Sequence, residues 1–157
     1  MKLNALVYCE NEFVKLEGKV ANGLARHSEK YNILGIIDST KAGLDAGEYL
    51  DGKETGIPIF PNIGDAINSL RLVPEYFIYG IAPLASFLDN EQKEIIFSAM
   101  KKGMHIVNGL PEFFTDDEEY RQKAREYGVR IYDIRKPPQR KDLHIFTGQI
   151  NKVKVPV

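Results

Sequence analysis

The fold of this chain is decided by the stretch Ile33-Leu34-Gly35-Ile36-Ile37-Asp38-Ser39-Thr40-Lys41-Ala42-Gly43. Its five leading apolar or glycine positions are typical of a strand buried on both faces, as in a parallel sheet covered by helices. Asp38 would then stand at the carboxyl end of that strand, where open α/β sheets bind their ligands. In the other interpretation, Asp38 only caps the polar turn that follows. The stretch by itself leaves both interpretations open.

Apolar runs alternate with helical patterns on both sides of this stretch. Strands are predicted at 3–8, 33–38, 56–60, 75–81, 104–107 and 129–133, and helices at 19–30, 62–72 and 116–127, with a short helical turn at 45–50. A further helix is predicted between Asp89 and Gly103. Asp89 and Gln92 form a capping-box pattern, and Gly103 suits a left-handed residue after the helix, as Gly128 does after the last one.

This alternation predicts an α/β fold: a doubly wound, mostly parallel, six-stranded Rossmann-like sheet with helices on both faces. The expected strand order is 3-2-1-4-5-6, with a crevice between the first and fourth strands. Pro58 indicates that the third strand lies at an edge of the sheet. We expect the α/β domain to cover residues 1–134, and a basic, proline-containing exit segment to cover residues 135–157.

The composition narrows the classes of partner. The chain has 157 residues, with 21 basic and 22 acidic side chains and a net charge of -1, so it has no overall field to hold nucleic acid or an anionic membrane. The lone Cys9 excludes an intramolecular disulfide and any multi-cysteine metal site, and we interpret it as a packing residue. No apolar run approaches a membrane span, and the first residues predict a strand rather than a signal peptide. We expect a soluble, cytoplasmic protein with no metal site.

The loop after the first strand argues against standard NAD binding. It lacks G-x-G-x-x-G, and it carries Glu10, Glu12 and Glu17 where a pyrophosphate would need free amides and positive potential. Lys19, next to Gly18, is the one side chain in this region that we expect to receive a phosphate. A dinucleotide-dependent oxidoreductase is therefore a weaker alternative.

Two other loops supply the candidate ligand contacts. In the loop that follows Asp38, the acid is a candidate to bind a ribose hydroxyl and Lys41 to neutralise a phosphate or carboxylate. In the loop after the fifth strand, Asn108 and Glu112 are candidates for a polar ligand, although Pro111 and Glu112 also suit the start of a helix. The predicted cofactor-binding residues are Asp38, Ser39, Thr40, Lys41, Gly43, Asn108, Gly109 and Glu112. No catalytic residue is predicted.

The segment after the last strand is basic. The sequence places Arg135, Lys136, Arg140, Lys141 and His144 within ten residues, stiffened by a Pro137-Pro138 pair. Such a run is either a solvated linker or a contact for an anion or a neighbouring domain. Together with Lys19, these side chains are the predicted anion or interdomain contacts.

Several blocks resemble a bacterial and archaeal family long described as of unknown function, some members of which are DgcN-type D-glutamate N-acetyltransferases. The resemblance covers essentially the whole chain and corresponds to the N-terminal half of the family. It is carried by Asp38-Ser39-Thr40-Lys41-Ala42-Gly43 with Asp45-Ala46-Gly47, Asn108-Gly109 with Glu112-Phe113, Asp133-Ile134-Arg135-Lys136-Pro137-Pro138, and Arg140-Lys141-Asp142-Leu143-His144 with Phe146-Thr147-Gly148. The last two blocks are the most specific.

The resemblance implies a Rossmann-like domain followed by a P-loop domain. No G-x-x-x-x-G-K-[ST] occurs in this sequence, so the chain resembles one domain of a larger enzyme and should be inactive alone. Acetyl-CoA or ATP is the expected ligand of the full-length protein, and a homo-oligomer is compatible with the family. Leu44 and the stretch 84–87 depart from the family pattern, which argues against phosphate contacts there. The competing hypothesis is a non-catalytic module for small-anion binding or oligomerisation.

Overall fold

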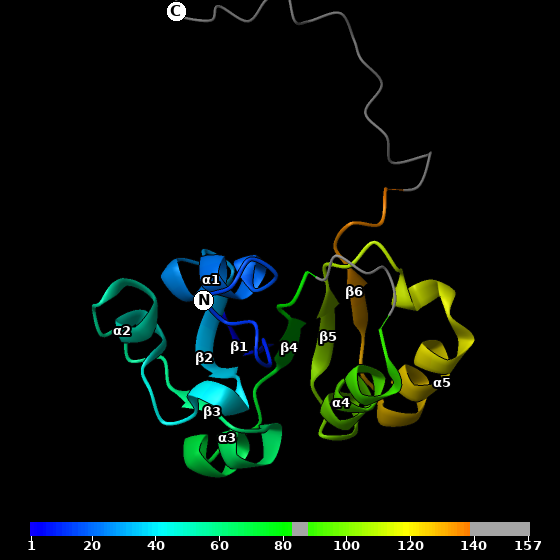
Figure 1. The fold of residues 1–157 in the computed structure, drawn as a ribbon. Helices are drawn as coiled ribbons and strands as arrows, with labels where there is room; N and C mark the ends of the chain where they lie inside the picture. The colour runs from blue at the N-terminus through cyan, green and yellow to red at the C-terminus, as the bar shows by residue number, and fades with distance from the viewer. Residues whose placement is uncertain (83–87, 139–157) are drawn as a thin grey trace, which may run out of the picture.

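The computed structural model describes residues 1–82 and 88–138. Its centre is a parallel sheet with the order β3-β2-β1-β4-β5-β6 (Figure 1). The strands are β1 (Leu3–Tyr8), β2 (Tyr31–Ile37), β3 (Ile59–Phe60), β4 (Tyr76–Tyr79), β5 (His105–Asn108) and β6 (Ile131–Asp133). The predicted fold class and strand order are confirmed, and β3 with its preceding Pro58 lies at an edge.

Helices cover both faces of this sheet. They are α1 (Lys19–Arg26), α2 (Ala46–Asp51), α3 (Ile63–Leu70), α4 (Asn90–Lys101) and α5 (Glu118–Tyr127). Because crossovers between parallel strands are right-handed, the steps from β1 to β3 place their helices on one face and the steps from β3 to β6 on the other. Figure 1 accordingly shows α1 and α2 on one side of the sheet and α3 and α4 on the opposite side.

The residues predicted to begin and end α4, and to end α5, have the expected conformations. Asp89 and Gln92 form the predicted capping box at α4. Gly103 and Gly128 take left-handed backbone angles, with φ of 86° and 67°, as predicted.

Two helix boundaries differ from the prediction. The helix predicted to reach residue 30 ends at Arg26, because His27 is extended and Ser28 Oγ accepts a hydrogen bond from the Tyr31 amide at the start of β2. The acid-rich segment before α5 is split: Phe114–Asp116 forms a 3-10 turn, and Asp117 caps the helix that begins at Glu118.

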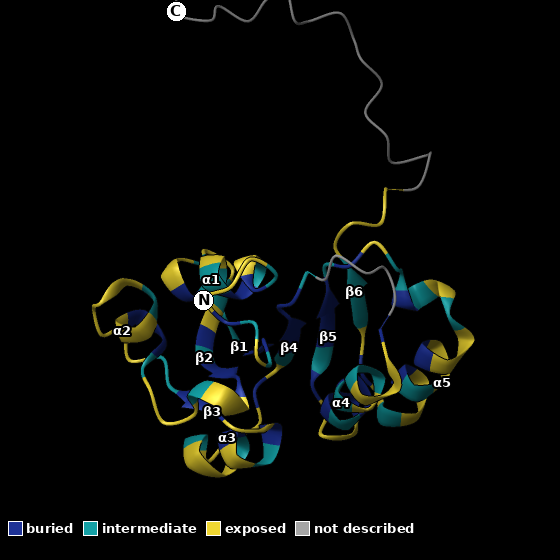
Figure 2. Ribbon diagram, in the orientation of Figure 1, coloured by how far each residue is buried: buried dark blue, intermediate teal, exposed yellow. Residues whose placement is uncertain are grey.

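The core lies along the central strands. Leu6, Val7, Ile36 and Phe77 are fully buried, and Figure 2 shows the strands as the buried layer between exposed helix surfaces. Strands β1 and β4 pack closely at their carboxyl ends. A Cβ on Gly80 would lie 2.6 Å from Val7 Cγ1, and the Gly80 amide donates to the Tyr8 carbonyl at 2.8 Å. The ends of β1 and β4 are therefore in direct contact, and the nearest neighbours of Gly80 are the Val7 and Ala21 side chains and the Tyr8 carbonyl.

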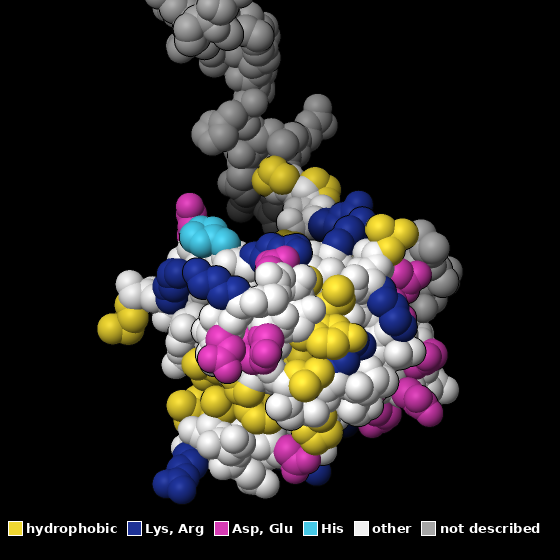
Figure 3. Space-filling view, turned by 60° about the vertical axis from the view of Figure 1, so that its left-hand side comes forward, with side chains coloured by type: hydrophobic (Ala, Val, Ile, Leu, Met, Phe, Trp, Pro, Cys, Tyr) yellow, Lys and Arg dark blue, Asp and Glu magenta, His cyan; other side chains and the backbone are white. Residues whose placement is uncertain are grey.

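The described surface carries charges of both signs. On the face drawn in Figure 3, basic and acidic side chains are interspersed rather than gathered into one patch. None of the helices in residues 1–82 and 88–138 is both long and apolar enough to cross a membrane.

Candidate functional site

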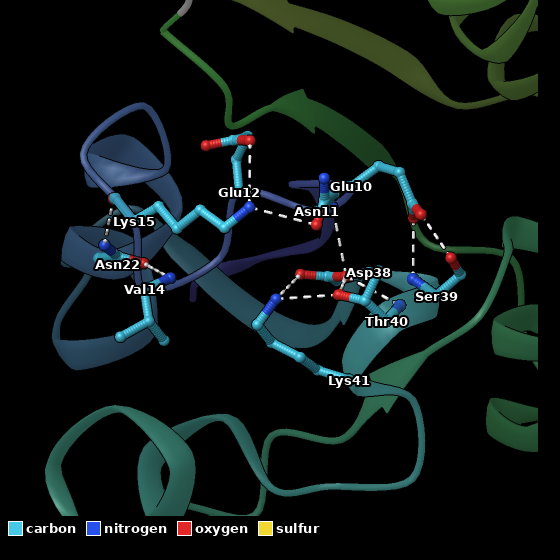
Figure 4. Close-up of polar contacts among 10 residues, drawn as sticks. All are labelled: Glu10, Asn11, Glu12, Val14, Lys15, Asn22, Asp38, Ser39, Thr40 and Lys41. Atoms are coloured by element: carbon cyan, nitrogen blue, oxygen red, sulfur yellow. Dashed lines mark hydrogen bonds and ion pairs between the residues drawn. The ribbon is translucent and has the colours of Figure 1, made fainter.

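Asp38 is buried and accepts four hydrogen bonds from its own chain (Figure 4). Its Oδ1 accepts from the Thr40 amide at 3.0 Å, from Thr40 Oγ1 at 2.6 Å and from the Asn11 amide at 3.2 Å. Its Oδ2 accepts from Lys41 Nζ at 3.0 Å. The turn-cap interpretation of Asp38 therefore describes the geometry, and the role of Asp38 in ligand binding stays a prediction.

The same hydrogen bonds lower the pKa of Asp38 and so favour its charged form. Burial alone would raise the pKa of this carboxyl, but donation from Thr40, Lys41 and the Asn11 amide lowers it below its ordinary value. The Lys41 side chain is only 11% exposed, and its ammonium also lies 2.9 Å from Thr40 Oγ1. Lys41 is thus held in an internal ion pair.

The neighbouring acid, Glu10, is arranged differently. Glu10 lies two positions after β1, and its carboxylate accepts from both the amide of Ser39, at 2.8 Å, and the hydroxyl of Ser39. This contact joins the loop after β1 to the loop after β2. The sequence pattern indicated Glu10 only as an obstacle to phosphate, and its link to Ser39 was not predicted. Its position just after a strand was the available signal.

A pocket of about 520 Å³ opens beside Glu10, where the carboxyl ends of β1 and β2 meet the first turns of α3 and α4. Its apolar floor comprises Tyr8, Ile37, Ile63 and Ile95. The remaining lining residues are Glu10, Ser39, Pro61, Asn62, Asn90, Glu91 and Glu94. Of the predicted contacts that lie in the described residues, only Ser39 lines this pocket. The others at the pocket were not predicted, because they come from segments far apart in the sequence.

The N-terminal end of α1 is covered by the loop that precedes it. The side chain of Asn22 accepts a hydrogen bond from the Val14 amide at 2.9 Å and donates to the Lys15 carbonyl at 3.3 Å, which folds the loop back onto the helix. A Cβ on Gly18 would lie 2.0 Å from the Glu12 carbonyl oxygen. Backbone therefore occupies the place where a dinucleotide fold presents an open glycine turn, and Lys19 lies exposed beside it.

Burial sets the chemistry of Cys9, the residue that follows β1. Burial, followed by the charges of Asp38 and Glu12, raises the pKa of the Cys9 thiol to about 12. A thiol with this pKa is not a nucleophile at neutral pH, in agreement with the packing role expected for it.

The second predicted loop forms a separate cluster at the ends of β5 and β6. Buried Asn108 donates to the Glu112 carbonyl at 2.7 Å and to Asp133 Oδ1 at 2.8 Å, and it accepts from the Leu110 amide at 2.9 Å. Gly109 lies against Ile134. Glu112 Oε2 is buried without a hydrogen-bond partner in the described part of the chain. Asn108 thus holds the loop in shape, and its predicted ligand contact stays a prediction.

The remaining predicted residues lie on the surface or outside the described residues. Gly43 stands in an exposed turn with a φ of 88°. Lys136 donates to Thr115 Oγ1 at 2.8 Å and pairs with Asp116, while Arg135 is exposed. Arg140, Lys141 and His144 lie outside the described residues. Within the described ranges, no group of three or more His, Cys, Asp and Glu side chains is placed to hold a metal ion.

Comparisons with known proteins agree on the fold. The family model described as "Domain of unknown function (DUF1611_N) Rossmann-like domain" matches residues 39–137. A crystal structure of a DUF1611 family protein from Anabaena variabilis superposes with a TM-score of 0.81 at 23% identity, covering 96% of this chain and 42% of that chain. A homoserine dehydrogenase from S. aureus superposes with a TM-score of 0.55 at 14% identity, covering 85% of this chain and 32% of that chain. At these identities both likenesses concern the fold alone.

A curated relative adds a functional name. D-glutamate N-acetyltransferase from Pseudoalteromonas sp is 31% identical over 67 residues, which are 43% of this chain and 20% of that protein. The chain therefore matches a minor part of the length of this relative and less than half of each superposed structure.

Proposed function

This chain belongs to the DUF1611_N family of Rossmann-like domains, and we propose that it is the small-molecule-binding domain of an N-acetyltransferase-like enzyme that acts on a D-amino acid such as D-glutamate. The family resemblance expected from the sequence is confirmed at the level of this domain. The N-acetyltransferase activity is inferred from the short match to the curated relative and from the family resemblance of the sequence blocks quoted above.

The observation that carries the proposal is the position of the pocket. Ligands of open α/β sheets bind outside the carboxyl ends of the strands, near the point where the strand order reverses. The pocket lies at the ends of β1 and β2 and is bounded by α4, which follows β4 across the reversal point. Its volume of about 520 Å³ and its apolar floor are typical of a site for a small organic molecule.

The pocket supplies binding groups rather than a complete catalytic set. Acetyl transfer needs an uncharged amine, a base to receive its proton and donors for the developing oxyanion. The lining offers carboxylates and the Asn62 and Asn90 amides, and Asn62 donates to Asp65 at 3.0 Å. In the described residues, however, no hydrogen bond or ion pair links one of the three carboxylates to a further titratable side chain that could tune it as a base. We therefore propose that this domain holds a substrate and that it is inactive alone.

The expected acyl donor or nucleotide is acetyl-CoA or ATP. A donor bound here would have to place its phosphates away from α1, because the loop from Cys9 to Gly18 covers the start of that helix. For the same reason, NAD bound in the usual dinucleotide manner is the weaker alternative. The similarity to a dehydrogenase supports the fold and does not change this order.

Calorimetric titration tests the proposal directly. Acetyl-CoA, ATP, NAD, D-glutamate and small amines are titrated into the wild-type chain and into Ile95→Phe, which places a larger side chain in the pocket. Ile57→Phe is the matched control, because Ile57 is also partly buried but lines a different hollow. We expect at least one ligand to bind the wild type and the control and to lose about tenfold in affinity in Ile95→Phe, or ~1.4 kcal/mol. Equal binding by all three proteins would place the ligand elsewhere.

A further inference from the structure

The charges around the pocket are all of one sign. Three of its lining residues are carboxylates, namely Glu10, Glu91 and Glu94, and no lysine or arginine of residues 1–82 and 88–138 lines it. Glu91 and Glu94 are exposed on the first turns of α4, and Glu10 faces them from the loop after β1. A phosphate or a dicarboxylate entering this pocket would meet like charges from two elements.

The positive N-terminal ends of α3 and α4 do not cancel the negative potential of the three glutamates. The N-termini of α3 and α4 border the pocket, and each contributes roughly half a positive charge. Asp89 caps α4 and lies next to the pocket, so the start of that helix is already compensated. Two half charges are outweighed by the three carboxylates of the lining.

The negative potential of the pocket also affects Tyr8, which lies in its apolar floor. Burial, together with the charges of Glu10, Asp89 and Glu91, raises the pKa of Tyr8 to about 12. Each of these carboxylates therefore acts against a negative charge at the Tyr8 hydroxyl. The same potential stabilises a positive charge above the Tyr8 ring, whose face also attracts cations.

From this geometry we propose that the pocket binds an organic amine in its protonated form, with the apolar body of the amine on the isoleucine floor and the ammonium group at the glutamate rim. This inference rests on the proposed function, in which it identifies the pocket ligand as the amine substrate rather than the phosphorylated donor. It also predicts that this amine carries fewer negative groups than D-glutamate.

The arrangement of the acids favours an organic cation over a metal ion. In the described residues no three acidic, histidine or cysteine side chains converge on one point, as a metal ion requires. The carboxylates are instead spread around an opening with an apolar floor. An ammonium group, with its three donors, is satisfied by such separated acceptors.

Three probes of the same shape test the charge preference: 2-phenylethylamine, 2-phenylethanol and 3-phenylpropionate. We expect the amine to bind about tenfold more tightly than the alcohol, since a charge-assisted hydrogen bond is worth more than a neutral one. The carboxylate should bind most weakly, and the amine should lose affinity as salt is raised. Binding is followed by calorimetry and by chemical shifts of the pocket residues.

Variants that neutralise single glutamates test whether the rim of the pocket causes the preference for the amine. In Glu91→Gln and Glu94→Gln we expect the amine to bind about threefold to fivefold more weakly, because each removes one screened negative charge, while the alcohol is unaffected. Glu54→Gln is the matched control, because Glu54 is exposed and lines none of the pockets described above. Unchanged amine binding in both pocket variants would contradict the inference.

The outcomes separate this inference from the proposed function. If the alcohol or the carboxylate binds as tightly as the amine, and Ile95→Phe abolishes that binding, the pocket is a ligand site but the charge preference is wrong. The same conclusion follows if ATP binds there more tightly than the amine. If no probe and no substrate is affected by Ile95→Phe, the proposed site itself fails.

Discussion

Two acidic residues stand side by side at the carboxyl ends of β1 and β2, and they are held in opposite ways. Asp38 is completely buried, and both of its oxygens accept hydrogen bonds from its own turn or from the neighbouring loop. Glu10 is partly exposed, accepts only from Ser39 among the described residues and borders an open pocket. The contrast shows that an acid at a strand end is structural when it is fully buried among several donors, and accessible to a ligand when it is partly exposed and borders a cavity.

The ends of β5 and β6 repeat the first arrangement. Asp133 accepts from Asn108, from the Phe114 amide and from both the amide and hydroxyl of Thr115. As at Asp38, a carboxylate at a strand end organises the turn beside it. The molecule thus has two internally satisfied acids at this edge and one acidic pocket between α3 and α4.

Asp38→Asn should have the largest effect. We expect the free energy of unfolding to fall by about 3 kcal/mol, because the variant leaves the nearly buried Lys41 ammonium without its carboxylate. Urea denaturation followed by circular dichroism measures this change, with Glu54→Gln as the control. A loss below about 1 kcal/mol combined with a large loss of ligand affinity would reverse the comparison and make Asp38 a ligand contact.

Asp133→Asn should have the next largest effect. An asparagine amide would face a backbone donor of Phe114 or Thr115, so we expect a loss of about 2 kcal/mol in the free energy of unfolding. The same denaturation experiment measures it. Amine binding in the pocket should be unchanged, and a parallel loss of binding would show that the two ends of the sheet edge are coupled.

Acid should weaken the wild type through Asp38. The folded-state pKa of Asp38 is below its unfolded value, so its contribution is present above the unfolded pKa of about 3.9 and is lost as pH falls through the lower folded pKa. This loss should be smaller than that in Asp38→Asn, because a protonated carboxyl keeps some of the hydrogen bonds. Unfolding free energies at several pH values below 5 should fall less steeply in Asp38→Asn than in the wild type. Parallel slopes would contradict the assignment.

Glu10→Gln should have the smallest effect on stability. Glu10 is partly exposed, and Ser39 is its one hydrogen-bond partner in the part of the chain that the structure describes, so we expect a change of less than about 1 kcal/mol. Binding of 2-phenylethylamine should nevertheless weaken about threefold to fivefold, as for the other rim glutamates. Calorimetry and denaturation on the same sample separate the two readouts. A stability loss as large as that of Asp38→Asn would mean that Glu10 is also a structural acid.

Much of the fold could be predicted because the signals are local. Apolar runs marked every strand, the Asp89–Gln92 capping box marked α4, and glycines closed two helices. The prediction placed the end of α1 four residues too late, because a hydrogen bond between Ser28 and Tyr31 starts the next strand, and the start of α5 two residues too early, because a separate 3-10 turn precedes it.

The site was harder to predict than the fold. The sequence pattern led to Asp38 and Asn108, and both lie at strand ends as expected. Whether their polar atoms are free depends in part on distant partners, the Asn11 amide for Asp38 and the Asp133 carboxylate for Asn108, which no spacing rule indicates. The pocket was missed because its lining comes from loops and helices that are separated by most of the chain.

The sequence by itself determined the Rossmann-like sheet, its strand order and the presence of acids at its carboxyl edge, because buried parallel strands and helix ends have short-range signatures. Only the tertiary structure decided which of these acids are buried in internal hydrogen bonds and which line a pocket. The physical reason is that complete burial and the Asn11 amide of another loop add to the local donors of Asp38, whereas Glu10 borders a pocket that several distant segments build.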